Sequence, residues 1–290
     1  MTGWVLYDDE QYKKNSWFAQ RLVECLSKTA EVRLILTQSL QFGTRNGEAF
    51  FSIGKEQIKA PDFAVSRTIF PLLSSVLESA GTRVFNSFRV SKFCNDKRYT
   101  YSGLAGSNIP ILDTWFFEKR FFSPESIEET DYPMVLKSAA GHGGSEVFLL
   151  KSKEELLNAL NNLSDGRFLL QKVCPSVGKD VRVYLLGGKV LAAILRTSDN
   201  FKSNYSLGGK ASLYELNSRE KDLINKVLSM MPGIPDFVGM DFLIDGDKWY
   251  FNEIEDVVGT RMLYECLNMD AAEVYSEYIT VQMSKENCVK

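Results

Sequence analysis

The chain has 290 residues, a formal net charge of −3 and 44% hydrophobic residues. This length exceeds the usual size of one hydrophobic core, so two or three lobes are expected, and the composition argues against a disordered chain. The mixed charges form no basic stripe, so we expect no nucleic-acid partner.

The cysteines are scattered and odd in number, and no pair is spaced as C-x-x-C. Such thiols are typical of a reducing compartment and do not indicate disulfides or a zinc site. The first ten residues lack the basic start and long apolar core of a signal peptide, and no run of eighteen apolar residues occurs. We therefore expect a cytoplasmic protein without a membrane partner. The five cysteines are Cys25, Cys94, Cys174, Cys266 and Cys288.

Residues 1–88 alternate between strand and helix patterns, which predicts a small α/β domain with a mostly parallel sheet. Apolar residues at helical spacing predict a helix over 15–29. Asn46 and Gly47 predict the turn of a small hairpin. Further strands are expected at 3–7, 32–36, 62–65 and 84–86, and a further helix at 71–80.

Residues 89–173 and 174–290 are expected to form two further regions. Ser152 and Glu155 form a capping-box pattern that specifies the start of the only helix between the strands of the second region. A helix through Lys97 precedes its strands, expected at 111–115, 134–138, 146–150 and 167–173. In the third region we expect strands at 180–186 and 189–195, a helix from Asn217 to Pro232, an acidic hairpin and a C-terminal helix.

The acidic hairpin folds back at an Asp-Gly turn, residues 245–246. Asp241 and Glu253 face each other if the loop holds an odd number of residues, such as three, and Glu255 shares a strand face with Glu253. Carboxylates that converge without an interleaved Lys or Arg repel one another unless a hard cation relieves them. Mg²⁺ with phosphate oxygens is the natural occupant, which favours a phosphoryl-transfer site. The alternative is an ordinary exposed acidic hairpin.

A glycine-rich turn follows Lys137 on an expected strand and precedes another strand. Its backbone N–H groups and the lysine charge suit a polyphosphate. The lysine precedes the glycines, so this is not a Walker A loop, and a glycine hairpin without a ligand is the alternative. His142 lies in the turn and is the only histidine. We expect it to cover a ligand or face water instead of serving as a catalytic base.

The order of these features resembles that of ATP-grasp ligases. The matching segments are Lys137 with its glycine turn, Gln171-Lys172-Val173, Gly178-Lys179-Asp180-Val181-Arg182 and the acidic hairpin. The segments Asp180 to Arg182, Ala192 to Arg196 and Phe201 to Ala211 look more narrowly like the RimK-type branch, the glutamate ligases that extend protein tails, and their relatives. The similarity spans about residues 84–265, and Asn86 and Asn95-Asp96-Lys97 also match.

The resemblance implies an α/β protein whose α+β lobes form an ATP-grasp fold behind an N-terminal, Rossmann-like pre-ATP-grasp domain. The implied domains are residues 1–88, the central lobe 89–173 with the glycine turn, and the C-terminal lobe 174–290 with the metal site. Phosphates would be bound by lysines, adenine by the main chain at residues 172–173, and ribose by Asp180. The implied nucleotide-binding residues are Lys97, Lys137, Gly141, Gly143, Gly144, Gln171, Lys172, Val173, Asp180 and Asn204.

The resemblance also implies the metal and catalytic residues. Asp241 and Glu253 match the family's metal carboxylates, with Glu253 bridging two Mg²⁺ ions and Mn²⁺ as an alternative. Arg196 would steady the transferred phosphoryl group, with Arg182 beside it and Lys137 on the phosphates.

Two departures from the family pattern concern the metal loop and a nearby cation. The family reads Glu-x-Asn-x-x-Pro-Gly, whereas residues 253–259 read Glu-Ile-Glu-Asp-Val-Val-Gly. Glu255 thus replaces an amide and is expected to ligate the second metal. Lys202 stands where an arginine is common, and both it and Arg261 are candidate substrate residues. Arg261 would clamp a carboxylate; a surface arginine or a salt bridge to Glu265 is the alternative.

The predicted activity is that of an ATP-dependent carboxylate–amine ligase. The γ-phosphoryl group moves to a substrate carboxylate, and an amine then displaces phosphate, which leaves an amide, ADP and phosphate. The expected partners are a carboxylate-bearing substrate and an amine on an amino acid, peptide or protein tail; their identities and self-association stay open. The alternatives are an ATP-grasp kinase and a non-catalytic ATP-binding regulatory module. A nicotinamide dehydrogenase is disfavoured because the first strand lacks G-x-G-x-x-G.

Overall fold

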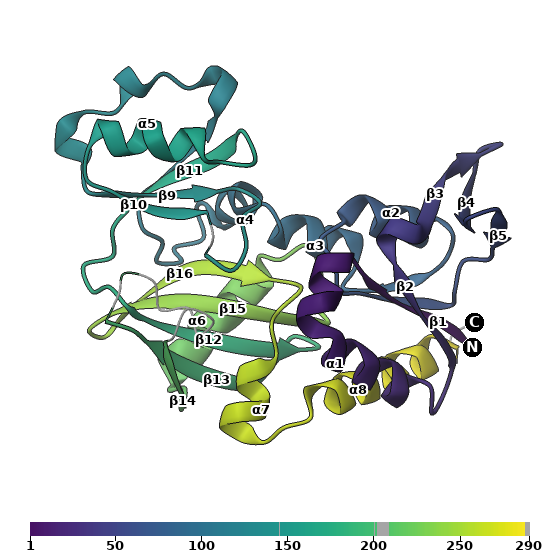
Figure 1. Ribbon diagram of the computed structural model, residues 1–290. Helices are drawn as coiled ribbons and strands as arrows, with labels where there is room; N and C mark the ends of the chain where they lie inside the picture. The colour runs from purple at the N-terminus through teal and green to yellow at the C-terminus, as the bar shows by residue number, and fades with distance from the viewer. Residues whose placement is uncertain (145, 200, 202–208, 288–290) are drawn as a thin grey trace.

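A computed structural model describes residues 1–144, 146–199, 201 and 209–287 of the chain. Its strands form four sheets, which lie in an N-terminal part, a central lobe and a C-terminal lobe (Figure 1). The predicted α/β class is confirmed, and the boundaries at residues 88 and 173 stay a prediction.

The N-terminal part is built on a fully parallel sheet of order β2-β1-β6-β7. Helix α1 begins before the expected residue 15, because the Asp8 side chain accepts a hydrogen bond from the Gln11 backbone N–H at 2.8 Å and caps the helix. The elements are β1 (Thr2–Tyr7), α1 (Asp9–Leu26), β2 (Glu31–Leu36), β6 (Phe63–Ser66), α2 (Pro71–Ser79) and β7 (Arg83–Phe85).

A separate antiparallel sheet projects from this part of the molecule (Figure 1). The predicted turn at Asn46-Gly47 is confirmed, since both residues adopt positive φ angles of 54° and 85°. Its strands are β3 (Leu40–Arg45), β4 (Glu48–Ile53) and β5 (Glu56–Ile58), preceded by the 3-10 turn Thr37–Ser39.

The central lobe has an antiparallel sheet of order β10-β9-β11-β8, covered on one face by α5. The helix expected through Lys97 is two helices, because the Asp96 side chain accepts from the Arg98 N–H and caps a new one. The strand expected from residue 111 begins at Thr114. The elements are α3 (Phe88–Cys94), α4 (Lys97–Leu104), β8 (Thr114–Glu118), three 3-10 turns (Lys119–Phe121, Pro124–Ser126, Glu129–Asp131), β9 (Met134–Ser138), β10 (Val147–Leu150), α5 (Lys153–Asn161) and β11 (Arg167–Lys172).

The C-terminal lobe has an antiparallel sheet of order β14-β13-β12-β15-β16. The helix expected from Asn217 is confirmed, with that residue as its N-cap. The single C-terminal helix expected from the sequence is two helices separated by Asn268, which adopts a left-handed conformation. The elements are β12 (Lys179–Leu186), β13 (Lys189–Thr197), β14 (Lys210–Leu213), α6 (Ser218–Ser229), β15 (Phe237–Asp245), β16 (Lys248–Glu255), α7 (Arg261–Leu267) and α8 (Ala271–Asn287).

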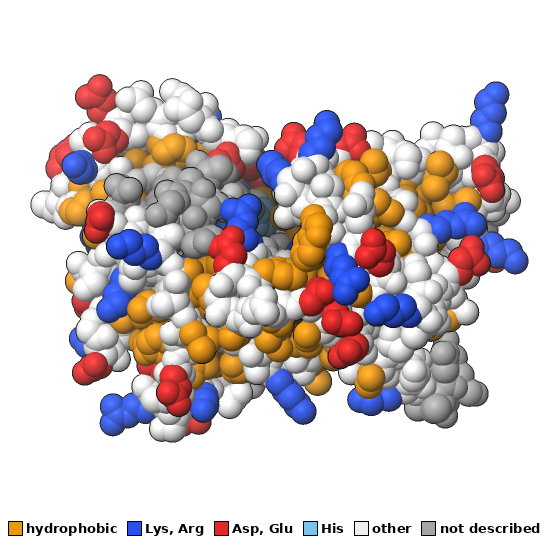
Figure 2. Space-filling view, turned by 60° about the horizontal axis from the view of Figure 1, so that its bottom comes forward, with side chains coloured by type: hydrophobic (Ala, Val, Ile, Leu, Met, Phe, Trp, Pro, Cys, Tyr) orange, Lys and Arg blue, Asp and Glu red, His pale blue; other side chains and the backbone are white. Residues whose placement is uncertain are grey.

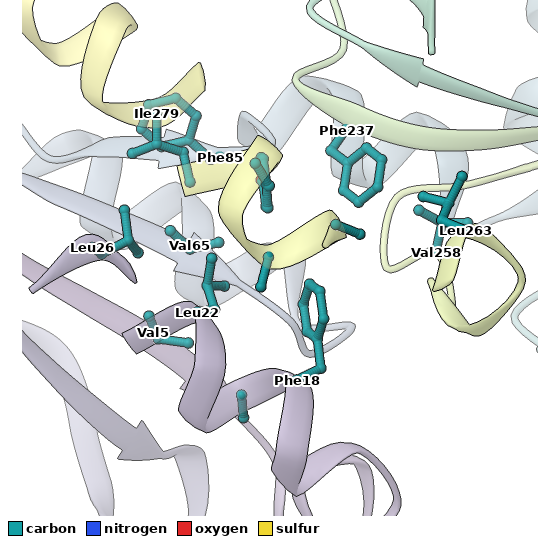
Figure 3. Packing of buried hydrophobic residues seen from close by; sticks show 14 of the residues in the cluster. Val5, Phe18, Leu22, Leu26, Val65, Phe85, Phe237, Val258, Leu263 and Ile279 are labelled. Atoms are coloured by element: carbon teal, nitrogen blue, oxygen red, sulfur yellow. The ribbon is translucent and has the colours of Figure 1, made fainter. Parts of the chain in front are cut away.

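The last helix returns to the N-terminal part and packs beside α1 (Figure 1). Figure 3 shows how side chains of α1, the parallel sheet and α8 converge on one apolar cluster. Phe18 and Leu22 of α1, Ile279 of α8 and Val258 from the loop after β16 all belong to this cluster. This core therefore fixes the end of the acidic hairpin against the N-terminal sheet.

None of the helices in the described ranges combines the length and apolar character that crossing a membrane requires. On the face shown in Figure 2, lysine and arginine side chains are interspersed with acidic ones, and apolar side chains gather between them.

Asn86 joins the N-terminal part to the C-terminal lobe. Its side-chain oxygen accepts from the N–H groups of Asp236 and Phe237 at 2.6 and 3.1 Å. Its amide N–H₂ donates to the carbonyls of Phe237 and Asp256 at 2.9 and 3.3 Å. The side chain is only 3% exposed, so these backbone groups have no ready access to water.

Replacing Asn86 with alanine is expected to lower the free energy of unfolding by about 2–4 kcal/mol, because it leaves several buried backbone groups unpaired. Urea unfolding measures this change. Asn158→Ala, at an exposed position of α5, is the matched control and should stay within about 0.5 kcal/mol of the wild type. An equal effect of the two substitutions would contradict the assignment.

Candidate nucleotide and metal site

The acidic hairpin aligns Asp241 directly opposite Glu253, as the sequence predicts. The expected odd-numbered loop is wrong, since Asp245 pairs with Lys248 across a two-residue turn. The missing residue is supplied by a bulge, because Phe242 pairs with Phe251 and Asn252 is left over. The bulge, and not the turn, therefore sets the register of the two carboxylates.

Asn252 at the bulge accepts hydrogen bonds from the central lobe at both its side chain and its backbone. Its side-chain oxygen accepts from the Lys137 Nζ at 2.7 Å, and its backbone carbonyl accepts from the Tyr101 hydroxyl at 2.7 Å. An extra residue in a strand re-aims its side chain, so the bulge turns this amide toward the lysine.

Two lysines face Glu253 from the central lobe. Lys97 begins α4 and lies 3.5 Å from a Glu253 carboxylate oxygen, and it also donates to the Gly141 carbonyl. Lys137 lies on β9 and is 7% exposed. Burial lowers the pKa of Lys137 to about 8, against a smaller raising effect of Glu253. Both ammonium groups are thus placed at the edge where the two lobes meet.

A chain of alternating charges crosses the floor of the C-terminal sheet. The Asp241 carboxylate accepts from the Arg182 Nε at 2.7 Å and from Arg196 at 2.7 Å. Arg196 also donates its Nε to both oxygens of Asp180, at 3.0 and 2.9 Å. At the other end, Arg182 lies 2.9 Å from a Glu255 oxygen. Two guanidinium groups therefore separate three carboxylates.

The sheet register explains this order, since Arg182 on β12 pairs with Asp241 on β15, and Asp180 pairs with Arg196 on β13. The expectation that no cation interleaves the carboxylates is therefore wrong: the cations come from neighbouring strands. Burial acts to raise the pKa of Asp241, but Arg182 and Arg196 outweigh it and hold the pKa at about 2. Burial raises the pKa of Glu255, only partly offset by Arg182.

The carboxylates offer the hard oxygen donors that Mg²⁺ prefers, and Asp241 and Glu253 lie on facing register positions. Each is nevertheless engaged by a lysine or an arginine. Within the described residues, no group of three or more His, Cys, Asp or Glu side chains is arranged to hold a metal ion. The donor chemistry therefore fits Mg²⁺, but an ion would have to replace a cationic side chain.

A cleft lies between the central and C-terminal sheets and encloses about 800 Å³ of space, part of it open solvent. The sequence-predicted residues that line it are Lys97, Lys137, Gly141, Gly144, Gln171, Lys172, Asp180, Arg196 and Glu253. The structure thus brings both lysines, the glycine turn and Arg196 together around one cavity.

Other predicted residues lie off the cleft lining, namely Gly143, Val173, Arg182, Asp241 and Glu255. Asp241 has no exposed surface and sits behind Arg196 in the charge chain. Gln171 is also buried, and its amide donates to the Tyr101 and Thr114 hydroxyls at 3.0 and 2.8 Å.

The sequence prediction missed the apolar walls of the cleft, formed by Leu112, Val135, Val147, Val177 and Leu243, and also Asn252, Cys174, Ser176, Gly178 and Phe201. A signal existed for two of them. Val135 lies two residues from Lys137, and Leu243 two residues from Asp241, and residues two apart share a strand face.

Further predictions concern Lys202, Asn204, Arg261 and His142. Lys202 and Asn204 lie outside the described residues. Arg261 is exposed at the first position of α7, and its role in substrate binding stays a prediction. Burial, followed by Lys97, lowers the pKa of His142 to about 4, so this histidine is neutral at pH 7.

Comparison with known proteins decides the family. The family model of the RimK-like ATP-grasp domain matches residues 94–279. The chain belongs to this family. The predicted resemblance and the predicted class of reaction, ATP-dependent ligation of a carboxylate to an amine, are thereby confirmed.

Two relatives of this RimK-like chain are named as synthases. Beta-citrylglutamate synthase B of Danio rerio is 29% identical over 88% of this chain and 67% of its own length. N-acetylaspartylglutamate synthase A of Homo sapiens is 29% identical over 88% of this chain and 69% of its own length. A solved structure of the ATP-grasp ligase PsnB, complexed with minimal precursor, Mg and ADP, has a TM-score of 0.67 at 18% identity, covering 97% of this chain and 98% of that one. This last likeness shows the shared fold.

If Lys137 binds nucleotide as predicted, nucleotide binding should depend on pH. Its pKa of about 8 means that the ammonium loses its proton above pH 8, and with it the charge that attracts phosphate. Between pH 7.5 and 9, the affinity for the magnesium complex of AMPPNP should fall by about eightfold if only the charged lysine binds. Calorimetric titration measures it. Lys137→Arg should flatten the profile, and an unchanged slope in this variant would contradict the assignment.

Glu255 is predicted to ligate a metal although it pairs with Arg182. Glu255→Gln should then weaken Mn²⁺ binding in the presence of AMPPNP by about tenfold, because an amide is a poorer ligand of a hard cation than a carboxylate. Electron paramagnetic resonance of free Mn²⁺ measures this affinity. Glu154→Gln, at an exposed position of α5, is the control. Equal Mn²⁺ affinities of all three proteins would leave Glu255 as a partner of Arg182 only.

Proposed function

We propose that this chain joins a carboxylate-bearing substrate to the amino group of L-glutamate, with ATP as the source of the activating phosphoryl group. The cleft carries the proposal: two lysines, Arg196 and Glu253 converge at its polar end, and apolar side chains form its walls. An apolar slot that ends in cations suits a nucleotide base and its polyphosphate. The names of both synthases above support glutamate as the amine.

The apolar wall beside Lys172 and Leu243 would hold adenine, and Lys97 and Lys137 would bind the phosphates. Asn252 keeps Lys137 directed into the cleft, since its oxygen accepts from the ammonium. The glycine turn lies over the same end of the cavity through Gly141 and Gly144. Closure of this turn would exclude water that hydrolyses an acyl phosphate.

The γ-phosphoryl group is negatively charged, and this charge must be neutralised while the group moves to the carboxylate. Arg196 lines the cleft and is the guanidinium nearest to this task. The substrate amine then attacks the acyl carbon and phosphate leaves, so that ADP, phosphate and an amide are formed. Positioning and charge supply the catalysis, because the phosphate itself provides the leaving group.

Mg²⁺, when bound by Asp241 and Glu253, would neutralise phosphate charge and bridge phosphate oxygens. Two ions, with Glu253 between them and Glu255 on the second, are our proposal for this chain, with Mn²⁺ as a substitute. Arg196 donates a hydrogen bond to an Asp241 carboxylate oxygen. We propose that Arg196 must release this oxygen before a cation can bind to it. We propose that Arg196 then turns to the phosphates, so that cation and guanidinium exchange partners.

The ligase assay incubates the chain with ATP, Mg²⁺, L-glutamate and a panel of carboxylates, and follows ADP release and the mass of any condensed product. We expect ADP release that requires both substrates, and a product whose mass is the sum of the two less one water. Lys137→Met should reduce the rate by at least about a hundredfold. Lys151→Met, which removes an exposed lysine, is the control.

The same assay separates the kinase alternative. A stable phosphorylated carboxylate or hydroxyl product without an amide would overturn the ligase proposal, as would ADP release that no second substrate stimulates.

A further inference from the structure

Arg67 is a buried arginine without a carboxylate partner. Three arginines of the chain are less than 9% exposed: Arg67 at 5%, Arg182 at 7% and Arg196 at 4%. The other two form ion pairs with buried carboxylates. Arg67 forms none within the described residues. Buried charges are normally paired, so an unpaired buried guanidinium indicates a missing anion.

The surroundings of Arg67 satisfy only part of its hydrogen-bonding capacity. One terminal nitrogen donates to the Val258 carbonyl at 2.8 Å, and the guanidinium lies 5.2 Å from the ring centre of Phe18. Its Nε is buried and donates no hydrogen bond. The buried Tyr7 hydroxyl lies beside the guanidinium: burial raises the pKa of Tyr7, and the proximity of Arg67 acts, more weakly, to lower it. Asp256 is within electrostatic reach, but no ion pair joins it to Arg67. Donors are therefore left over at a point where a carboxylate would accept them.

The position in the sheet is where α/β proteins bind ligands. Tyr7 ends β1, and Arg67 directly follows β6, so both lie at the carboxyl edge of the parallel sheet. In the strand order β2-β1-β6-β7, the chain places β2 on one side of β1 and β6 on the other. The order of strand addition therefore reverses between β1 and β6. Ligands of open α/β sheets bind outside the carboxyl ends of the strands at such a switch point.

The same arginine contacts the loop that follows the acidic hairpin. Val258 lies three residues after Glu255, and the next residue, Gly259, is exposed. A side-chain carbon added at Gly259 would meet no atom within 4 Å, so open space borders the loop at the residue next to the one that Arg67 contacts. Figure 3 shows Val258 in the same cluster as Phe18, between α1 and the C-terminal helices. A group held in this space would lie between the N-terminal sheet and the acidic site.

We propose that Arg67, assisted by the Tyr7 hydroxyl, forms a subsite for a carboxylate group of the amino-acid substrate. The proposal rests on the proposed ligase function and places the substrate between the N-terminal sheet and the loop after β16. A carboxylate there supplies the charge that Arg67 lacks and accepts the unused N–H and O–H donors. Its anchoring would direct the substrate's amine toward the cleft that holds Arg196 and Glu253.

Calorimetry with Mg²⁺ and ADP present tests the subsite, with L-glutamate and glutarate as probes and glutaramide as the uncharged control. The wild type should bind both carboxylates and not the diamide. Arg67→Gln should weaken L-glutamate binding by at least about tenfold, the loss expected for a charge-assisted hydrogen bond, with AMPPNP binding unchanged. Arg89→Gln, which removes an exposed guanidinium, should bind as the wild type does.

The Tyr7→Phe variant distinguishes a role of this site in glutamate binding from a purely structural role. The Tyr7 hydroxyl is buried beside Arg67 and forms no hydrogen bond of good geometry, so its removal should change the melting temperature little while L-glutamate binding weakens about threefold. A structural role alone predicts lower stability with unchanged affinity. Wild-type affinity in a folded Arg67→Gln or Tyr7→Phe protein, or no carboxylate binding by the wild type, would overturn the subsite.

The experiments can reject the proposed subsite and the proposed reaction independently of each other. Glutamate binding that depends on Arg67, together with no condensed product in the ligase assay, would keep the subsite and reject the reaction. A condensed product whose KM for glutamate is the same in wild type and Arg67→Gln would keep the reaction and reject the subsite.

Discussion

Asp241 is fully buried, yet its carboxylate is charged, because Arg182 and Arg196 donate hydrogen bonds to it from two neighbouring strands. Breaking a buried pair of this kind on one side commonly costs about 3–5 kcal/mol, since the other charge stays buried without a partner. The network therefore fixes the register of β12, β13 and β15 relative to one another. The positions of Asp180, Arg182, Arg196 and Glu255 depend on it.

The network also couples stability to the chemistry of the site. Arg196, which balances Asp241, is the group that a phosphate would engage in the proposed reaction, and Asp241 is the group that a cation would engage. Glu255 extends this balance, because it adds a carboxylate at the far side of Arg182 where the family has an amide. Each arginine thus lies between two acids, Arg182 between Asp241 and Glu255 and Arg196 between Asp180 and Asp241. Of the two, Arg196 is the one that lines the cleft.

Much of this architecture could be predicted from the sequence, because strand alternation, the helix caps at Ser152 and Asn217 and the Asn46-Gly47 turn are local signals. The sequence prediction missed the cap at Asp8 and therefore begins α1 too late. The facing of Asp241 and Glu253 was also predictable, but the bulge at Asn252 was not, since nothing local distinguishes an extra residue in the strand from one in the turn. The pairing of Arg182 with Asp241 depends on strands far apart in the sequence. The contact of Arg67 with Val258 likewise joins residues 191 positions apart.

The central claim is that Asp241 exchanges a guanidinium for a cation when nucleotide binds. A crystal structure of the chain with Mg²⁺ and AMPPNP tests it most directly. The account predicts an Asp241 oxygen about 2.1 Å from Mg²⁺ and the Arg196 guanidinium on the terminal phosphate. A structure with nucleotide in the cleft, metal bound elsewhere, and Asp241 still bonded to both Arg182 and Arg196 would contradict it.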